Sequence, residues 1–166
     1  MAFDTFIKID GVPGESTDDK HKDWIEVLSY NHSIRQPVSA TVSSAGGASA
    51  ERCDHDDFTF VKFVDKASPK LYELCCSGKH LKEVTIEMCR AGGDKVKYME
   101  IKLEKVIVSH VAPGGSSKGD HGFPTESISL NYATIKWTYT QQKRDDGTGG
   151  GNVTGGWSLL DNKVMA

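Results

Sequence analysis

The chain has 166 residues, with 23 acidic and 20 basic side chains, a formal net charge of −3 and a hydrophobic content of 37%. This balance is typical of a globular protein, and it excludes both wholesale disorder and the strongly basic surface of a nucleic-acid-binding protein. A domain of this length buries roughly 70% of its unfolded surface, so one domain over residues 1–166 is expected. Charges interrupt every apolar run before the roughly 18 residues that a membrane-spanning helix needs, so membrane insertion is not expected.

The first ten residues have neither the basic segment nor the long apolar segment of a secretory signal peptide. Synthesis and folding in the cytoplasm are therefore expected, which predicts reduced thiols at Cys53, Cys75, Cys76 and Cys89. No Cys-x-x-Cys pair occurs among them, so these cysteines are expected to be buried apolar thiols rather than zinc ligands.

Short apolar runs separated by turn residues fill most of the sequence and predict an all-β sandwich or barrel. The clearest run is 81–90, in which Val84, Ile86 and Met88 alternate with polar residues, as in a strand with one buried face. In chain order, strands are expected over residues 3–10, 24–33, 57–64, 81–90, 96–111, 126–140 and 157–161.

Two of these runs are unusually long, and the apolar phase of each slips by one residue partway along. In residues 96–111 the phase changes after Tyr98, and in residues 126–140 it changes across Ala133 and Thr134. A β-bulge or a sharp bend would keep each run as one strand, as happens where sheets curl into closed barrels. Two shorter strands in each run are an equally good interpretation.

One helix is predicted after the third strand, where Ser68 can cap it, Pro69 suits its first turn and Gly78 can end it. Its apolar face would consist of Leu71, Leu74 and Cys75. The helix is expected to lie across one opening or wall of the barrel.

Three stretches are predicted as long loops, at residues 11–23, 37–52 and 144–156. The last is rich in glycine, but it does not lie between a strand and a helix of a βαβ unit, so no nucleotide site is expected there. Long loops are uncommon in compact domains unless they have a function or are ordered by a partner.

Catalytic and metal-binding patterns are weak in this sequence. The residues Asp54, His55, Asp56 and Asp57 carry donors that a divalent cation accepts, but alternation along a strand would point them to opposite faces. A solvated strand entrance is the favoured interpretation, so no metal site is expected. No nucleophile-elbow motif is present, and neither catalytic residues nor a cofactor are expected.

Three segments indicate a function more specifically than composition does. They are GESTDDKHKDWIEVLSY at residues 14–30, DFTFVKFVDKASPKL at 57–71 and PTESISLNYATIKWTY at 124–139. All three resemble segments of the haemolysin-coregulated protein (Hcp) family, and with the opening strand the resemblance spans nearly the whole chain.

The resemblance implies a mainly β fold, a β-barrel of two antiparallel sheets with one short flanking α-helix, similar to phage tail-tube subunits. It implies a structural protein and no enzyme. Its subunits would form homohexameric rings that stack into the tube of a bacterial type VI secretion system, inside a contractile sheath and below a valine-glycine repeat spike protein. Contraction would expel the tube with effector proteins in its pore, so that the protein is secreted without a signal peptide.

The loop at 37–52 is the candidate for contact between stacked rings, because its residues are small and uncharged up to Glu51. The residues assigned to this ring-stacking loop are Val42, Ser43, Ser44, Ala45, Gly46, Gly47, Ala48 and Ser49. A loop without a function is the alternative.

Two other functions compete with the tube subunit. A monomeric ligand-binding β-barrel would use its interior as a pocket. A metal-assisted hydrolase would need Asp54, His55 and Asp57 together in one site.

Overall fold

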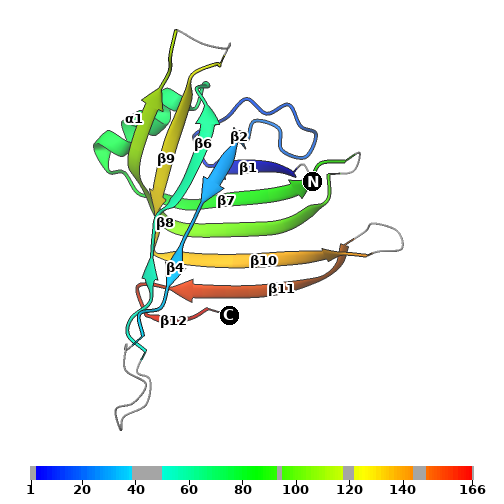
Figure 1. Ribbon diagram of the computed structural model, residues 1–166, viewed down its shortest axis with the longest axis vertical. Helices are drawn as coiled ribbons and strands as arrows, with labels where there is room; N and C mark the ends of the chain where they lie inside the picture. The colour runs from blue at the N-terminus through cyan, green and yellow to red at the C-terminus, as the bar shows by residue number, and fades with distance from the viewer. Residues whose placement is uncertain (1–2, 39–49, 93–94, 118–121, 144–148, 166) are drawn as a thin grey trace.

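The computed structural model describes residues 3–38, 50–92, 95–117, 122–143 and 149–165 (Figure 1). The first sheet, sheet A, has the strand order β12 (Lys163–Val164), β11 (Gly149–Ser158), β10 (Thr134–Gln142), β8 (Lys97–Gly114), β7 (Leu81–Arg90), β1 (Phe3–Ile9) and β2 (Ile25–Val27). The second, sheet B, joins β3 (Ser29–Asn31), β6 (Phe58–Phe63), β9 (Thr125–Asn131) and the second half of β8. A small third sheet pairs β4 (Ile34–Arg35) with β5 (Asp54–His55).

Strand pairing connects the two sheets on two sides of the molecule. Strand β8 pairs with β7 and β10 up to Val106 and with β9 from Ile107 onward. It bends at Lys105, whose φ is 52°, and its register with β9 shifts at Ser109. On the opposite side, β2 pairs with β1 and β3 pairs with β6, and the N–H of Leu28 between them donates to a carbonyl of β6. Strand pairing therefore follows a circuit through β1, β7, β8, β9, β6 and the β2–β3 segment.

The apolar core lies between the two sheets. Alternate residues of the strands enter it, for example Val84 and Ile86 from β7 and Ile128 and Leu130 from β9, all fully buried. Helix α1 (Ser68–Ser77) lies against β8 and closes the core beside it (Figure 1). The prediction of a mainly β chain with two antiparallel sheets and one flanking helix is thus confirmed.

The two phase slips have different structural causes. In β8, Met88 of β7 faces Met99 while Cys89 faces Lys97, so Tyr98 is the extra residue of a β-bulge in one continuous strand. The run at 126–140 instead divides into β9 and β10, which belong to different sheets. The side chain of Tyr132 remains buried where the chain changes sheet.

Three sequence-based boundaries are wrong. The run at 24–33 divides into β2 and β3, because the chain changes pairing partner at Leu28. The glycine-rich stretch predicted as a loop is strand β11 from Gly149 onward, since β10 supplies a backbone partner for its whole length. The run predicted at 157–161 leaves its strand after Ser158 and turns.

The helix prediction holds in its position but is wrong in its cap. Ala67 is the N-cap and Ser68 is the first helical residue, because the Ser68 hydroxyl is used in a buried polar network. Gly78 ends the helix in the left-handed conformation, with φ of 62°, and its N–H donates to the carbonyl of Leu74. Among the described residues, no helix is long and apolar enough to span a membrane.

Candidate assembly surfaces

The outward face of sheet B carries mostly small polar side chains, together with Val61 of β6 and with His110 of β8, which pairs with Ser129. On β6 the buried positions are Phe58, Phe60 and Lys62, so Thr59 and Val61 point outward. We call this surface the hydroxyl face, and its members are Ser29, Asn31, Thr59, Ser127 and Ser129. The hydroxyls of Thr59 and Ser129 lie 2.9 Å apart, across neighbouring strands. No outward residue of β3, β6 or β9 carries a charge.

The charges of these strands are turned into the interior instead. Lys62 and Glu126 have fully buried side chains, and the lysine Nζ lies 2.5 Å from Glu126 Oε1 and 2.7 Å from Asp65 Oδ1. Ser68 donates a 2.7 Å hydrogen bond to Glu126, and the Tyr72 hydroxyl also donates to it. Burial alone would raise the pKa of Glu126, but the hydrogen bonds from Lys62, Tyr72 and Ser68 outweigh it and lower that pKa. This network attaches the start of α1 to sheet B.

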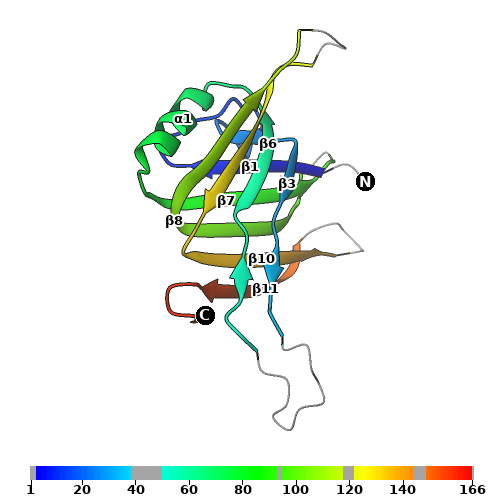
Figure 2. The same ribbon diagram turned by 60° about the vertical axis from the view of Figure 1, so that its left-hand side comes forward.

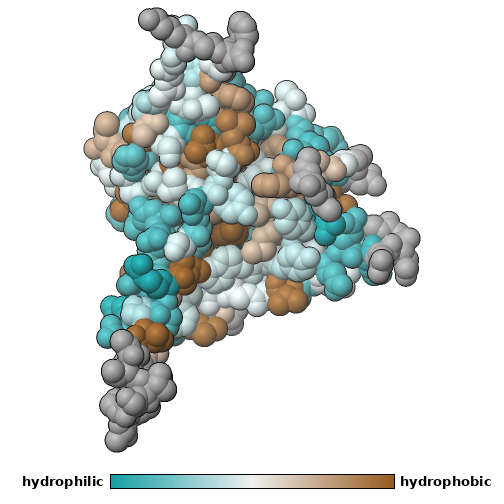
Figure 3. Space-filling model, in the orientation of Figure 1, coloured by the Kyte–Doolittle hydropathy of each residue, from teal (hydrophilic) through white to brown (hydrophobic). Residues whose placement is uncertain are grey.

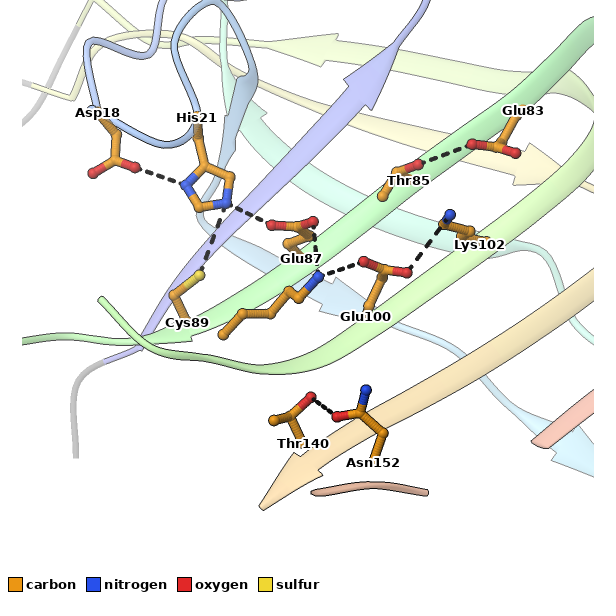
Figure 4. Close-up of polar contacts among 11 residues, drawn as sticks. Asp18, His21, Glu83, Thr85, Glu87, Cys89, Glu100, Lys102, Thr140 and Asn152 are labelled. Carbon is orange, nitrogen blue, oxygen red and sulfur yellow. Dashed lines mark hydrogen bonds and ion pairs between the residues drawn. The ribbon is translucent and has the colours of Figure 1, made fainter. Parts of the chain in front are cut away.

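The outward face of sheet A is charged (Figure 4). Lys97 lies 2.5 Å from Glu100 and 3.3 Å from Glu87, and Lys102 lies 3.8 Å from Glu100. Burial would lower the pKa of Lys97, but its hydrogen bond with Glu100 and the charge of Glu87 raise it. The outward faces of the two sheets thus differ in charge, because that of sheet B is neutral whereas that of sheet A is covered by ion pairs.

The loop at 11–23 covers one end of this charged face. His21 is 2% exposed, and its ring nitrogens lie 2.7 Å from Asp18 and 2.7 Å from Glu87 (Figure 4). The imidazole stacks on Phe6 with 4.2 Å between ring centroids. Hydrogen bonds from Lys95 and His21 lower the pKa of Asp18 to about 2. These side-chain contacts hold the loop together with backbone hydrogen bonds between its two ends, from the N–H of Gly14 to the Asp23 carbonyl and from the N–H of Asp23 to the Ser16 carbonyl.

An apolar groove of about 480 Å³ opens where β1 and β2 meet the end of β6. We call it the aromatic groove, and its exposed apolar residues are Phe3, Leu28, Phe63 and Phe123, each between 46% and 65% exposed. Apolar side chains are visible near the upper ends of β6 and β9 (Figure 3). Four carboxylates, at Asp4, Glu15, Glu26 and Asp65, also line the groove, together with Lys95, which lies 3.4 Å from Asp4. Grouped exposed apolar residues with a polar rim are typical of protein–protein contact sites.

A second candidate surface is the outer edge of β11. Among the described residues, β11 pairs on the side away from β10 only at Trp157 and Ser158, with the short strand β12. The edge carries Val153, which is 72% exposed, opposite Tyr139 of β10, which is 43% exposed. An unpaired edge is a template for backbone pairing with another chain.

The predicted ring-stacking residues, Val42 to Ser49, lie outside the described residues. The segments on both sides of them are described and paired. We call residues 34–38 and 50–55 the stalk, because β4 pairs with β5, Val38 pairs with Ala50, and the N–H of Glu51 donates to the Pro37 carbonyl. The stalk runs past β10 and β11 and projects away from both sheets (Figures 1 and 2).

The side chains considered as ligands of a metal ion, Asp54, His55 and Asp57, do not lie together in the fold. Asp54 lies 3.8 Å from Arg35, His55 is hydrogen-bonded to the Tyr132 hydroxyl, and Asp57 accepts hydrogen bonds from Ser109 and Asn131. Within the described parts of the chain, no group of three His, Cys, Asp or Glu side chains is arranged to hold a metal ion.

The four cysteines are free thiols in different environments. Cys89 is buried, Cys53 and Cys75 are partly buried, and Cys76 is exposed, so only Cys89 fully fits the expectation of buried packing. Burial, together with the charge of Glu87, raises the pKa of Cys89 to about 11.

Comparison with known proteins gives a consistent result. Residues 6–139 match the family model described as "Type VI secretion system effector, Hcp". The chain is 39% identical over 163 residues to Protein hcp1 of Pseudomonas aeruginosa, covering 98% of each chain. A solved structure of a type six secretion system protein is 34% identical, with a TM-score of 0.92 over 99% of this chain and 100% of that one.

The crystal structure of Hcp1 from Salmonella typhimurium is 35% identical, with a TM-score of 0.81, and covers 99% of this chain and 100% of that one. Sequence and fold therefore agree over nearly the full length. The chain belongs to the Hcp family of type VI secretion tube proteins, a structural family and not a family of enzymes.

Proposed function

We propose that this protein assembles into hexameric rings that stack into the inner tube of a type VI secretion system. Sheath contraction then expels the tube, with the valine-glycine repeat spike protein at its tip and effector proteins in its pore. The observation that carries the proposal is that one subunit has two unlike surfaces suited to contact, the aromatic groove and the outer edge of β11. Unlike surfaces favour head-to-tail contacts, which close into a ring when the rotation between subunits allows it.

A mutation that disrupts the aromatic groove should separate the subunits of the ring. A glutamate in place of Phe123 would remove an exposed aromatic ring from the contact and add a fifth carboxylate to a groove that holds four carboxylates and one lysine. The wild-type protein is expected as a hexamer with ring-shaped particles in negative-stain images. Phe123→Glu is expected to be monomeric.

Val38→Glu is the matched control for this experiment, because Val38 is 66% exposed, close to the 65% of Phe123, and lies on the stalk, outside both the groove and the β11 edge. Native mass spectrometry of the three proteins measures the result. A wild-type monomer at every concentration would overturn the ring and favour the monomeric ligand-binding barrel. Equal dissociation of both variants would overturn the assignment of the groove.

The hydroxyl face is the proposed lining of the pore. A neutral surface of small hydroxyls allows weak contact with many cargo proteins, since it imposes neither charge repulsion nor a large apolar contact. An arginine at Thr59 places a long cation on this face, and Thr138→Arg places one on the charged face of sheet A. Both threonines are partly buried. We expect T59R rings to retain less effector protein than T138R rings after co-purification, and equal retention would contradict the assignment.

Residues Val42 to Ser49 are proposed to make contact between stacked rings. The support is the stalk, whose paired strands flank this segment in the sequence and themselves project away from both sheets. Deletion of residues 42–49 is expected to leave hexamers intact and to abolish tubes and secretion into the medium. Normal secretion of that variant would rule out the assignment.

A further inference from the structure

A tyrosine and two histidines join the root of the stalk to the corner between the sheets. His32 lies just before β4, His55 is in β5, and Tyr132 follows β9 where the chain crosses to β10. The Tyr132 hydroxyl lies 2.7 Å from His32 Nε2 and 2.8 Å from His55 Nδ1. The two imidazole rings are 6.2 Å apart, and the His32 ring also packs on Phe58. Among the described residues, no other side chain of the sheets is hydrogen-bonded to side chains from both strands at the root of the stalk.

The hydrogen bonding of this triad depends on the single proton of the Tyr132 hydroxyl. A phenol has a single O–H donor, and each neutral imidazole offers one N–H and one acceptor nitrogen. When both histidines are neutral, the hydroxyl accepts from one ring and donates to the other, so both contacts are satisfied. When both are protonated, both ring nitrogens are donors, and the phenol proton loses its acceptor in a side chain that is 5% exposed. Two like charges then also face each other.

The charged and titratable groups around the triad are Asp56 and Asp57 beside the stalk, and His80, Lys82 and Lys105, which line a groove together with Tyr132. Burial lowers the pKa of His32, and the charge of His55 lowers it further, while Asp56 raises it. Burial also lowers the pKa of His55. Asp54 is 58% exposed and faces Arg35, so it does not offset the triad.

The Tyr132 hydroxyl itself keeps its proton over the range in which the histidines titrate. Burial raises its pKa, and the neighbouring Asp57, Cys53 and Asp56 raise it further. The proton that changes the triad therefore arrives on an imidazole.

We propose that His32, Tyr132 and His55 form an acid-sensitive latch, which holds the stalk against the corner of the sheets at neutral pH and releases it on protonation. An opened stalk binds protons more readily than the closed one, because the folded pKa of both histidines lies below their ordinary value of 6.5. The latch is therefore complete above about pH 6.5 and weakens as the pH falls through that value. The latch does not depend on the proposed tube function.

Amide hydrogen exchange of the full-length protein tests the latch directly. The informative amides are those of Asp56, which donates to the Ser33 carbonyl, and Glu51, which donates to the Pro37 carbonyl, with β7 amides as the reference. Rates are compared at pH 7.5 and 5.5 after correction for the intrinsic pH dependence of exchange. We expect stalk protection to fall relative to β7 by roughly tenfold to a hundredfold, the factors for one and for two imidazoles at a pH one unit below their ordinary pKa.

Three variants connect that loss to the triad. His32→Gln with His55→Gln keeps donors and acceptors but cannot be charged, and should make stalk protection independent of pH. Tyr132→Phe should exchange at pH 7.5 as wild type does at 5.5. His110→Gln, an exposed histidine of β8, should behave as wild type. Stalk protection that does not change with pH in the wild type, or a loss that persists in the double variant, overturns the latch.

Native mass spectrometry of the same samples separates the latch from the tube function. A monomer whose stalk exchange depends on pH would support the latch and contradict the ring. A hexamer whose stalk exchange does not depend on pH would contradict the latch and leave the ring supported.

Discussion

The buried pair of Lys62 and Glu126 gives an asymmetric prediction about stability. Lys62 has a second anion in Asp65, at 2.7 Å, but the only cation given for Glu126 among the described residues is Lys62. Lys62→Met removes the cation at nearly constant length and leaves a buried carboxylate without a counter-charge. Glu126→Gln removes the anion but leaves Lys62 paired with Asp65. Lys62→Met should therefore be the more damaging change.

The expected magnitudes follow from the two environments. Removal of one partner of a buried ion pair costs about 3–5 kcal/mol, which we expect for Lys62→Met. Loss of a charged hydrogen bond costs about 1.5–3 kcal/mol, which we expect for Glu126→Gln. For a protein of this size, the first range corresponds to a fall in Tm of roughly 6–20 °C. Combining Lys62→Met with Glu126→Leu should recover part of the loss, because no buried carboxylate at position 126 then lacks a counter-charge.

Urea unfolding followed by tryptophan fluorescence measures these differences. Protein concentration must be equal in all samples, because assembly adds stability that depends on concentration. Lys70→Met is the control, since Lys70 makes an exposed contact with Glu73 and should change the free energy of unfolding by less than about 1 kcal/mol. A Lys62→Met protein within about 1 kcal/mol of wild type would refute the reasoning. So would a larger loss in Glu126→Gln than in Lys62→Met.

Three further predictions concern the loop at 11–23 and the thiols. A methyl group on Gly14 would lie 2.3 Å from a backbone carbonyl oxygen, so Gly14→Ala should lower the free energy of unfolding by about 1–3 kcal/mol, and an unchanged urea midpoint would contradict this. Hydrogen bonds from Lys95 and a neighbouring histidine lower the pKa of Asp18 to about 2, so its contribution is complete above its ordinary pKa of 3.8 and is lost as the pH falls toward 2. Asp18→Asn should therefore flatten the change of the urea midpoint between pH 4 and 2, and an unchanged slope would count against it. Cys76 is exposed whereas burial raises the pKa of Cys89 to about 11, so a maleimide at pH 8 should modify Cys76 first, as peptide mass mapping can show.

Sequence patterns located most strands, because side-chain alternation is strong where one face is buried. The strand at 81–90 has the predicted bounds, and the slip after Tyr98 was correctly recognised as a possible bulge. The strand at 149–158 was missed, because five of its ten residues are glycines, which leave little side-chain alternation to recognise. Its partner is β10, and only the tertiary structure shows that pairing.

The burial of Lys62 and Glu126 could have been predicted from strand alternation. Lys62 is in phase with Phe58 and Phe60, and Glu126 is in phase with Ile128 and Leu130, so strand alternation alone places both on the core side. The contact between them could not be predicted, since 64 positions separate the two residues along the chain and their strands pair only in the fold. The triad of His32, Tyr132 and His55 was hidden for the same reason.

The long strand β8 has a mechanical consequence for the molecule. It contributes hydrogen bonds to sheet A with its first half and to sheet B with its second, without a break at Lys105. A force that pulls the two sheets apart is thus resisted by one covalent backbone as well as by the side chains packed between them. Separation requires many backbone hydrogen bonds to break together, so β8 should make the subunit stiff under load and slow to yield.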